Sequence, residues 1–204
     1  MNFKIFRKFF LLLSLSFLFL GSAFGQNISI TSVKLKEIKG ENSKFRTRAE
    51  IVFNNAIKVR GILVANISDK VLFKFPEYIS AKKQTYPQLK LLTAEANEVV
   101  RKALETREPQ GSSSISLKYR IAKFKKISSP SKTNILASVV FNESIEIECK
   151  VIEGKNGPWV LWPSEKRKDI GRWRKQIVIT DYSLRESVER DLIERYNKLS
   201  ENII

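Results

Sequence analysis

The sequence predicts an α+β protein of two tandem units, each a small antiparallel sheet followed by a C-terminal helix. First, residues 139–165 contain two alternating segments, a Gly-containing turn and a short aromatic segment that stops at a proline. Proline cannot donate to a strand ladder, so it ends such a segment. Second, residues 52–77 follow the same order. Third, an apolar period of three and four residues follows each stretch and indicates a helix packed on each sheet.

The two stretches match position by position, which predicts an internal duplication. Most matches lie 88 positions apart, and past the turn the spacing becomes 87. We predict that one residue was gained or lost in the turn, where length changes are best tolerated. Asn66 and Asp69 then stand where the second unit has Gly154 and Gly157. The matched segments are 52–54 with 140–142, 57 with 145, 59 with 147, 63–64 with 151–152, and 75–76 with 162–163.

The charge balance points to anionic partners. The 204 residues include 37 Lys and Arg against 21 Asp and Glu, a net charge of +16. Such a surplus suggests nucleic acid, anionic lipid or an anionic wall polymer, without choosing among them. Hydrophobic residues make up 43% of the chain, so a packed core is expected.

The residue types argue against catalysis. The chain has no His, which removes the commonest general base and the commonest metal ligand. The single Cys149 cannot form an internal disulfide, and its place in an alternating strand predicts a small, inert residue. No Ser has a distinctive base, and P-loop, dinucleotide and metal-ligand patterns are absent from the sequence. We predict a non-enzymatic protein with no cofactor, no metal and no small-molecule substrate.

Residues 1–25 have the pattern of a secretory signal peptide. Three basic residues precede an uncharged apolar run of 12 residues, 9–20, and Ala23-Phe24-Gly25 fits a small-x-small cleavage site. The pattern predicts an exported protein, periplasmic or envelope-associated. An uncleaved membrane anchor is one alternative, although the run is shorter than the roughly 20 residues of a span. A non-functional signal would leave the protein in the cytoplasm. Cleavage would leave 34 basic against 21 acidic residues, a net charge of +13.

The first unit is predicted over residues 27–108. A loop over 78–87 leads to a helix over 93–105 with Thr93 as its N-cap. Asn54-Asn55 marks a hairpin turn. The expected strands are 28–38, 45–53, 57–65 and 71–75, and the predicted linker to the next unit is 109–114, PQGSSS.

The second unit is predicted over residues 115–204. A loop over 166–175 and a short extended piece over 176–180 lead to a helix over 183–199, begun by a Ser183–Glu186 capping box. Acidic and basic residues alternate along this helix, which predicts a solvated, salt-bridged face. We expect its apolar stripe to pack on the sheet: Leu184, Val188, Leu192, Tyr196 and Leu199. The expected strands are 115–125, 135–141, 145–153 and 159–162.

Several short motifs recur at fixed spacing in the second unit. They are Lys150-Val151-Ile152-Glu153-Gly154, Asn156-Gly157, Trp159-Val160-Leu161-Trp162-Pro163-Ser164, and the helix positions Arg185, Val188, Leu192 and Tyr196. With these residues the unit resembles the SpoVG family, the stage V sporulation protein G or septation-protein family. That family has R-V-I-D/E-G, N-G-x-F-V-x-M-P-S and a terminal helix ending in Tyr. The resemblance covers residues 115–199, and the first unit shares it only through its likeness to the second.

The resemblance implies a self-associating sheet-plus-helix protein that is not an enzyme. It also implies a role in septum formation and sporulation, and DNA or RNA binding through basic residues. This chain departs from the family in its export signal, in its duplication, and at residues 173–179, where the family usually has D-I-x-H-P-I. We therefore expect an intrachain pseudo-dimer, able to self-associate, that binds a polyanion, with nucleic acid implied by the resemblance. The alternative is an exported envelope protein that binds anionic lipid, wall polymer or a division-site partner.

The basic loop before the last helix is the predicted binding surface. A cationic loop can neutralise phosphates and an indole can stack on a base. The same loop would attract anionic lipid. The remaining alternative is an ordinary solvated loop with Trp173 packed under the helix. Trp159 and Trp162 lie on opposite strand faces, so one is expected in the core. The predicted site residues are Lys166, Arg167, Lys168, Arg172, Trp173, Arg174 and Lys175, with Lys82, Lys83 and Tyr86 in the corresponding loop of the first unit.

Overall fold

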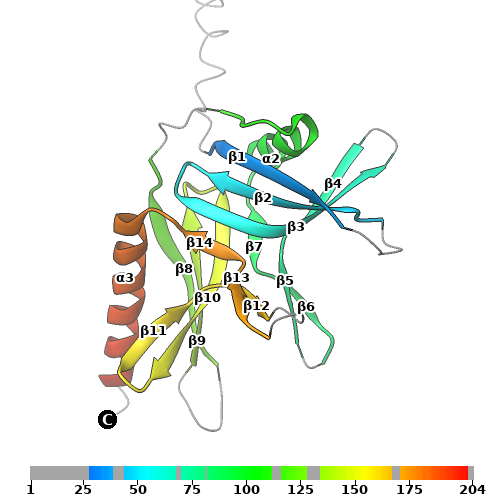
Figure 1. The fold of residues 1–204 in the computed structure, drawn as a ribbon. Coiled ribbons are helices and arrows are strands. Elements are labelled where there is room, and N and C mark those ends of the chain that lie inside the picture. Colours follow the sequence, from blue (N-terminus) through cyan, green and yellow to red (C-terminus); the bar gives the residue numbers. More distant parts are fainter. Residues whose placement is uncertain are drawn as a thin grey trace, which may run out of the picture.

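The computed structural model of the chain describes residues 28–38, 44–67, 70–80, 82–111, 116–127, 134–166 and 171–201. They form two antiparallel sheets, each followed by a helix, which confirms the predicted α+β class (Figure 1). The predicted signal segment, 1–25, and residues 112–114 of the predicted linker lie outside the described residues. Export and the unit boundaries therefore stay predictions.

The first unit contributes a four-strand meander, a small hairpin, a short strand and a helix. Consecutive strands of the meander pair antiparallel. The hairpin stands where the sequence predicted a loop over 78–87. The bounds are β1 (Ile30–Glu37), β2 (Thr47–Phe53), β3 (Ile57–Ile67), β4 (Lys70–Lys74), β5 (Glu77–Ile79), β6 (Thr85–Pro87), β7 (Leu89–Leu91) and α2 (Ala94–Thr106).

The second unit repeats this order. A second hairpin stands where the sequence predicted a loop over 166–175. The sequence analysis missed both hairpins because their strands are only three residues long, too short to show an alternating period. The bounds are β8 (Tyr119–Ile127), β9 (Asn134–Phe141), β10 (Ile145–Gly154), β11 (Gly157–Leu161), β12 (Ser164–Lys166), β13 (Trp173–Lys175), β14 (Ile177–Ile179) and α3 (Tyr182–Glu201).

Both units make the same tight turn between their second and third strands. Asn54 and Asn55 have φ of 48° and 56°, and Asn142 and Glu143 have φ of 45° and 50°. Two successive left-handed residues are typical of a type I′ turn, and Asn adopts that conformation readily. The Oδ1 atoms of Asn54 and Asn142 accept hydrogen bonds of 3.2 and 2.7 Å from the backbone just before the first strand of their unit. The turn predicted at Asn54-Asn55 is confirmed.

Each unit donates its short strand before the helix to the sheet of the other unit. β7 pairs antiparallel with β10, and β14 pairs antiparallel with β3. The two exchanges are equivalent. In one, Val59 pairs with Ile177. In the other, Ile147 pairs with Leu89, and these residues lie 88 positions after Val59 and 88 positions before Ile177. The sequence predicted 176–180 only as an isolated extended piece and did not predict β7. The two units are therefore arranged as a pseudo-dimer with reciprocal strand exchange.

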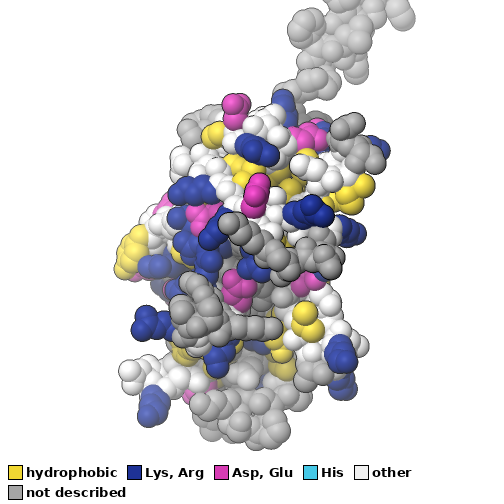
Figure 2. Space-filling view, turned by 45° about the vertical axis from the view of Figure 1, so that its right-hand side comes forward, with side chains coloured by type: hydrophobic (Ala, Val, Ile, Leu, Met, Phe, Trp, Pro, Cys, Tyr) yellow, Lys and Arg dark blue, Asp and Glu magenta, His cyan; other side chains and the backbone are white. Residues whose placement is uncertain are grey.

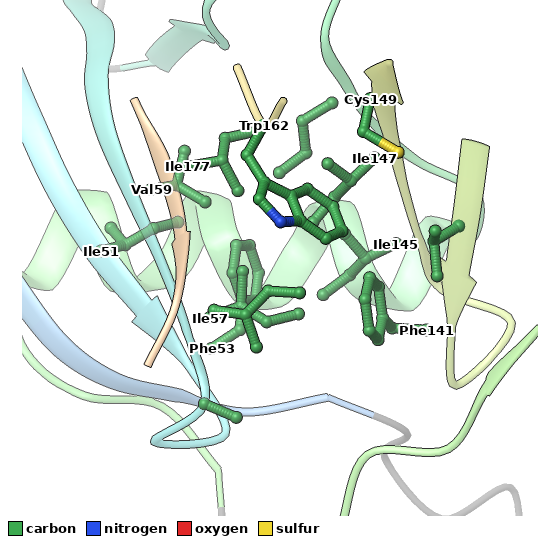
Figure 3. Packing of buried hydrophobic residues seen from close by; sticks show 14 of the residues in the cluster. Ile51, Phe53, Ile57, Val59, Phe141, Ile145, Ile147, Cys149, Trp162 and Ile177 are labelled. Carbon is green, nitrogen blue, oxygen red and sulfur yellow. The ribbon is translucent and has the colours of Figure 1, made fainter. Parts of the chain in front are cut away.

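The buried apolar side chains of both units form one core. Trp162 is 5% exposed and lies between the two sheets, whereas Trp159 is 46% exposed, so the prediction that one of the two is in the core is confirmed. Because the core is continuous, the two units depend on each other for burial of apolar surface. Figure 3 shows side chains of both sheets meeting around Trp162: Ile51, Phe53, Ile57, Val59 and Ile177 from one, Phe141, Ile145, Ile147 and Cys149 from the other.

The one-residue difference between the units lies in β3 and not in the turn. Between the pairs Glu50↔Arg60 and Ala49↔Ile62, Gly61 is left without a partner as a β-bulge with φ of 78°. Glycine adopts this conformation without the cost that a Cβ imposes.

The alignment of the two units past the bulge is therefore corrected. The pairs Leu63↔Lys74 and Lys150↔Leu161 are equivalent, at a spacing of 87. The predicted match of 63–64 with 151–152 is wrong by one residue. The residues that take the places of Gly154 and Gly157 are Ile67 and Lys70, and not Asn66 and Asp69.

The helix starts confirm one predicted cap and correct the other. The Thr93 hydroxyl accepts a hydrogen bond of 3.1 Å from Ala96 N, as predicted. In α3 the cap is Asp181, whose Oδ1 accepts from Leu184 N at 3.0 Å and from the Ser183 hydroxyl at 2.8 Å. The predicted Ser183 capping box is wrong, because the helix begins one residue earlier, at Tyr182.

The sequence predicted that the carboxylates of α3 lie on a solvated face. This prediction is wrong for two of them. Glu189 accepts a hydrogen bond of 2.8 Å from Trp162 Nε1, and Asp191 accepts one of 2.7 Å from the Tyr119 hydroxyl. Burial, and then the hydrogen bond to Asp191, raise the pKa of Tyr119 to about 12. The apolar stripe packs as predicted in its central part, where Val188, Leu192 and Tyr196 are buried, while Leu199 is exposed.

We expect the two units to unfold together. The Ile51→Ala substitution removes a fully buried side chain from the first sheet and should cost about 2–5 kcal/mol. All three Trp residues lie in the second unit. Their fluorescence should report the same lowered urea midpoint as far-UV circular dichroism, because the core is shared. A Trp transition that keeps its wild-type midpoint would contradict this expectation, and Thr85→Ala on exposed β6 is the control.

The two helix caps should differ in their pH dependence. Asp181→Ala and Thr93→Ala should each cost about 1 kcal/mol of unfolding free energy near neutral pH. Hydrogen bonds from Leu184 and Ser183 hold the pKa of Asp181 below its ordinary value of 3.8. Asp181 therefore contributes its full stabilisation above about pH 3.8, and this stabilisation is lost as the pH falls through the pKa of the folded state. Urea unfolding at pH 7 and pH 3 measures this: the cost of Asp181→Ala should shrink at pH 3, while the cost of Thr93→Ala should stay the same. A cost of Asp181→Ala that is equal at the two pH values would contradict the expectation.

Candidate polyanion-binding surface

The β12–β13 hairpin presents the basic residues that the sequence singled out. Lys166 pairs with Trp173, and Ser164 pairs with Lys175. Residues opposite each other and residues two apart share a face, so Lys166, Trp173 and Lys175 point to one side of the hairpin. Trp173 is 70% exposed, which excludes the alternative that it packs under the helix.

The structure places most of the predicted site residues on this hairpin and its loop. Lys166, Arg172, Arg174 and Lys175 are exposed, and Arg174 pairs with Glu165 on the other face from Trp173. Arg167 and Lys168 lie outside the described residues. The hairpin is therefore a short ribbon with an indole and two lysines on one face.

The β5–β6 hairpin is the counterpart in the first unit. Lys82 and Lys83 are exposed at its tip, and Lys83 has φ of 59°. Tyr78 and Tyr86 face each other across the hairpin, with ring centroids 6.4 Å apart, and both are about half exposed. Lys150 of β10 lies over the Tyr78 ring, with Nζ 5.0 Å from the centroid. This surface therefore combines cations with aromatic rings from both units.

The base of each hairpin is fixed to the central strand of the other unit. The backbone N–H of Gln176 donates to Pro163 O at 2.8 Å, and its backbone carbonyl accepts from Arg60 N at 2.7 Å. The Arg60 guanidinium also donates to Lys175 O at 3.4 Å. Gln88 makes the equivalent backbone hydrogen bonds in the first unit. Its N–H donates to Pro76 O at 3.1 Å, and its carbonyl accepts from Glu148 N at 3.0 Å. The strand exchange thus positions both hairpins.

The hairpin cations are available for an anionic partner. Within the part of the chain that the structure describes, Lys82, Lys83, Lys166, Arg172 and Lys175 have no carboxylate within 4.0 Å. By contrast, nearby Arg60 is neutralised by Glu50 at 2.7 Å. Figure 2 shows a face where Lys and Arg side chains spread widely, with fewer carboxylates between them. Exposed, unpaired cations are the groups that neutralise phosphates and release counterions.

The sequence did not predict the roles of Tyr78 and Lys150. Tyr78 was assigned to a loop, although its spacing from Tyr86 fits a hairpin pair. Lys150 was assigned to a strand of the other unit, and only the strand exchange brings it to Tyr78. No group of His, Cys, Asp and Glu able to hold a metal ion occurs among the described residues. In the same residues, no helix combines the length and apolar character of a transmembrane span.

Comparison with known proteins identifies the second unit. The SpoVG family model matches residues 118–198. Over 78 residues the chain is 32% identical to the "Putative septation protein SpoVG" of Clostridium perfringens strain SM101, which covers 38% of this chain and 86% of that protein. The protein of the same name from Clostridium acetobutylicum is also 32% identical over 78 residues, covering 38% of this chain and 81% of that protein.

This chain belongs to the SpoVG family through its C-terminal half. Members of the family are generally non-enzymatic regulators. The family model matches the second unit, and the first unit is related to it by the equivalent strands, turns and exchange described above. No solved structure matches the chain.

The one thiol of this SpoVG-family chain should be unreactive while the protein is folded. Cys149 is 3% exposed on β10, and burial raises the pKa of its thiol to about 12. Thiolate is the nucleophilic form, so we expect no reaction with a thiol reagent such as DTNB at pH 8 until urea unfolds the chain. Rapid labelling of the native protein would contradict the predicted inert role.

Proposed function

We propose that this chain is a non-enzymatic binding protein in which two SpoVG-like units act as one intrachain pseudo-dimer. Its ligand is a nucleic acid, bound by the basic residues and aromatic rings of the two hairpins, in a septation or sporulation type of regulation. The observation that carries the proposal is the pair of equivalent hairpins, each anchored on the other unit. The family membership of the second unit supports a regulatory role.

Each hairpin has the parts that single-stranded nucleic acid needs. Trp173 offers an exposed ring for stacking between Lys166 and Lys175, and Tyr78 and Tyr86 offer two rings beside Lys82 and Lys83. Base stacking on aromatic rings tolerates any sequence, while the cations follow the phosphates. The net charge of +16 would draw the chain to polyanions from a distance.

The binding test uses fluorescence anisotropy with labelled single-stranded DNA, duplex DNA and RNA of equal length across a salt series. Trp173→Ala should weaken single-strand binding about tenfold, since one base stack contributes roughly 1–3 kcal/mol. The double variant Lys166→Ala/Lys175→Ala should reduce the salt slope by about 1.4–1.8, because each phosphate contact contributes roughly 0.7–0.9.

The matched control is Lys34→Ala/Lys36→Ala, which removes the same charge from β1. If the control variant loses as much affinity and salt slope as the hairpin variant, the net charge acts and not the hairpin. If the wild-type chain binds none of the three nucleic acids at low salt, the nucleic-acid proposal is wrong.

A second candidate function follows from the signal pattern at residues 1–25. An exported chain would meet anionic lipid, wall polymer or a division-site protein rather than nucleic acid. Its hairpins would then dock on the envelope, at about 1 kcal/mol per basic residue near an anionic surface. Clustered cations on two linked units would increase attachment through avidity.

Export is tested by fusing residues 1–25 to a reporter that is active only outside the cytoplasm. We expect activity with the native segment and its loss when the apolar run 9–20 is interrupted by two Arg substitutions, because a charged core is not translocated. An inactive native fusion would remove the envelope candidate and favour a cytoplasmic ligand. Sedimentation of the chain with vesicles containing anionic lipid, compared with neutral vesicles, tests the surface itself.

A further inference from the structure

The two helices begin at equivalent positions and end at different ones. Ala94 and Tyr182, the first residues of α2 and α3, are 88 positions apart, the same spacing that relates the exchanged residues Leu89 and Ile177 just before the helices. α2 has 13 residues and α3 has 20, so α3 continues for seven residues beyond the point where α2 stops. The first unit therefore has no equivalent of the last two turns of α3.

In the second unit these turns cover the end of the sheet. Tyr196 is 3% exposed, and its hydroxyl donates to Glu153 Oε2 on β10 at 2.7 Å. The sheet beneath is closed, with Ile135 1% exposed and Val151 fully buried, and with Phe124 packed against the core. An aromatic ring on a helix is thus the native occupant of this end of the sheet.

In the first unit the same place is a hollow of about 630 Å³. Its lining is mixed: Leu35, Val64, Val71 and Leu104 contribute apolar surface among polar and charged side chains. The strand ladders place Leu35 where the second unit has Phe124, and Thr47 where it has Ile135. They also place Asn66 where the second unit has Glu153, the acceptor for Tyr196. Smaller side chains and a shorter helix together leave the space open.

The chain itself turns away from this hollow. Arg107 ends α2 in a left-handed conformation, with φ of 63°. Gln110 then exchanges two backbone hydrogen bonds of 2.8 Å with Ile30 at the far end of β1. The segment that would extend α2 across the hollow is therefore used elsewhere.

We propose that this hollow is a docking site for an amphipathic helix of another protein, which inserts an aromatic residue where the second unit has Tyr196. A helix that lies in a groove and inserts residues spaced along one of its faces is a common recognition mode. Lys70 and Arg107 line the hollow together with Glu37 and Glu105, so its charges of both signs suit a helix that carries both, as α3 does. A second copy of this chain is a poor occupant, because its own Tyr196 is already buried.

The test uses the full chain and a labelled probe with the sequence of residues 189–201, ERDLIERYNKLSE, held helical by a side-chain staple. We expect saturable binding by fluorescence polarisation. The variant Thr47→Trp fills the hollow and should weaken binding at least tenfold, while Thr85→Trp on β6 should not change it. Changing the probe Tyr to Ala should also weaken binding tenfold or more.

A second comparison keeps the test decisive if Thr47→Trp alters the fold, which thermal unfolding would show. Asn66→Ala removes the proposed acceptor and should abolish any preference for the Tyr probe over a Phe probe. No saturable binding to the wild-type chain, equal binding by Thr47→Trp and Thr85→Trp, or a Tyr preference that Asn66→Ala leaves unchanged would each overturn the proposal. Polyanion binding by Thr47→Trp and Asn66→Ala should stay at the wild-type level, which separates this surface from the hairpins.

Discussion

The open edges of the two central strands are the constraint on which the rest of the structure depends. β3 is 11 residues long, and its own hairpin partner β4 covers only residues 63–67 of one edge. β11 likewise covers residues 150–154 of β10. The uncovered stretches, 57–62 and 145–149, include fully buried residues, where unpaired backbone groups would be costly. Each unit supplies a short strand that pairs with the open edge of the other unit's sheet, so neither sheet is complete within its own half of the chain.

This exchange also explains where the charged hairpins lie. The chain has to leave its own sheet after β4 or β11 and reach the other sheet at β7 or β14, and each hairpin is formed on the way. Backbone bonds at Gln88 and Gln176 hold its base against the other unit. The proposed binding surface at these hairpins would therefore depend on the pairing of the two units and not on either unit alone.

Joining two copies in one chain allows them to differ, which an identical dimer cannot do. The first hairpin carries two tyrosines and two lysines, while the second carries a tryptophan and a denser set of basic residues. The first helix is shorter, and the first sheet is left open at one end. The shared core maintains the fold, while the surfaces of the two units differ.

The sequence by itself determined the repeat, the α+β class, the turn at Asn54-Asn55, the Thr93 cap and the place of Cys149 in a strand. These features follow from local preferences and from alternation along the chain, which act over a few residues. Tertiary structure decided the exchange of β7 and β14, because three-residue strands carry too little pattern to name a partner. Tertiary structure also showed that the inserted residue is Gly61, because only the pairing of β2 with β3 reveals which position has no partner. The exposure of Trp173 and the meeting of Tyr78 with Lys150 depend on contacts between residues far apart in the chain, which spacing alone does not encode.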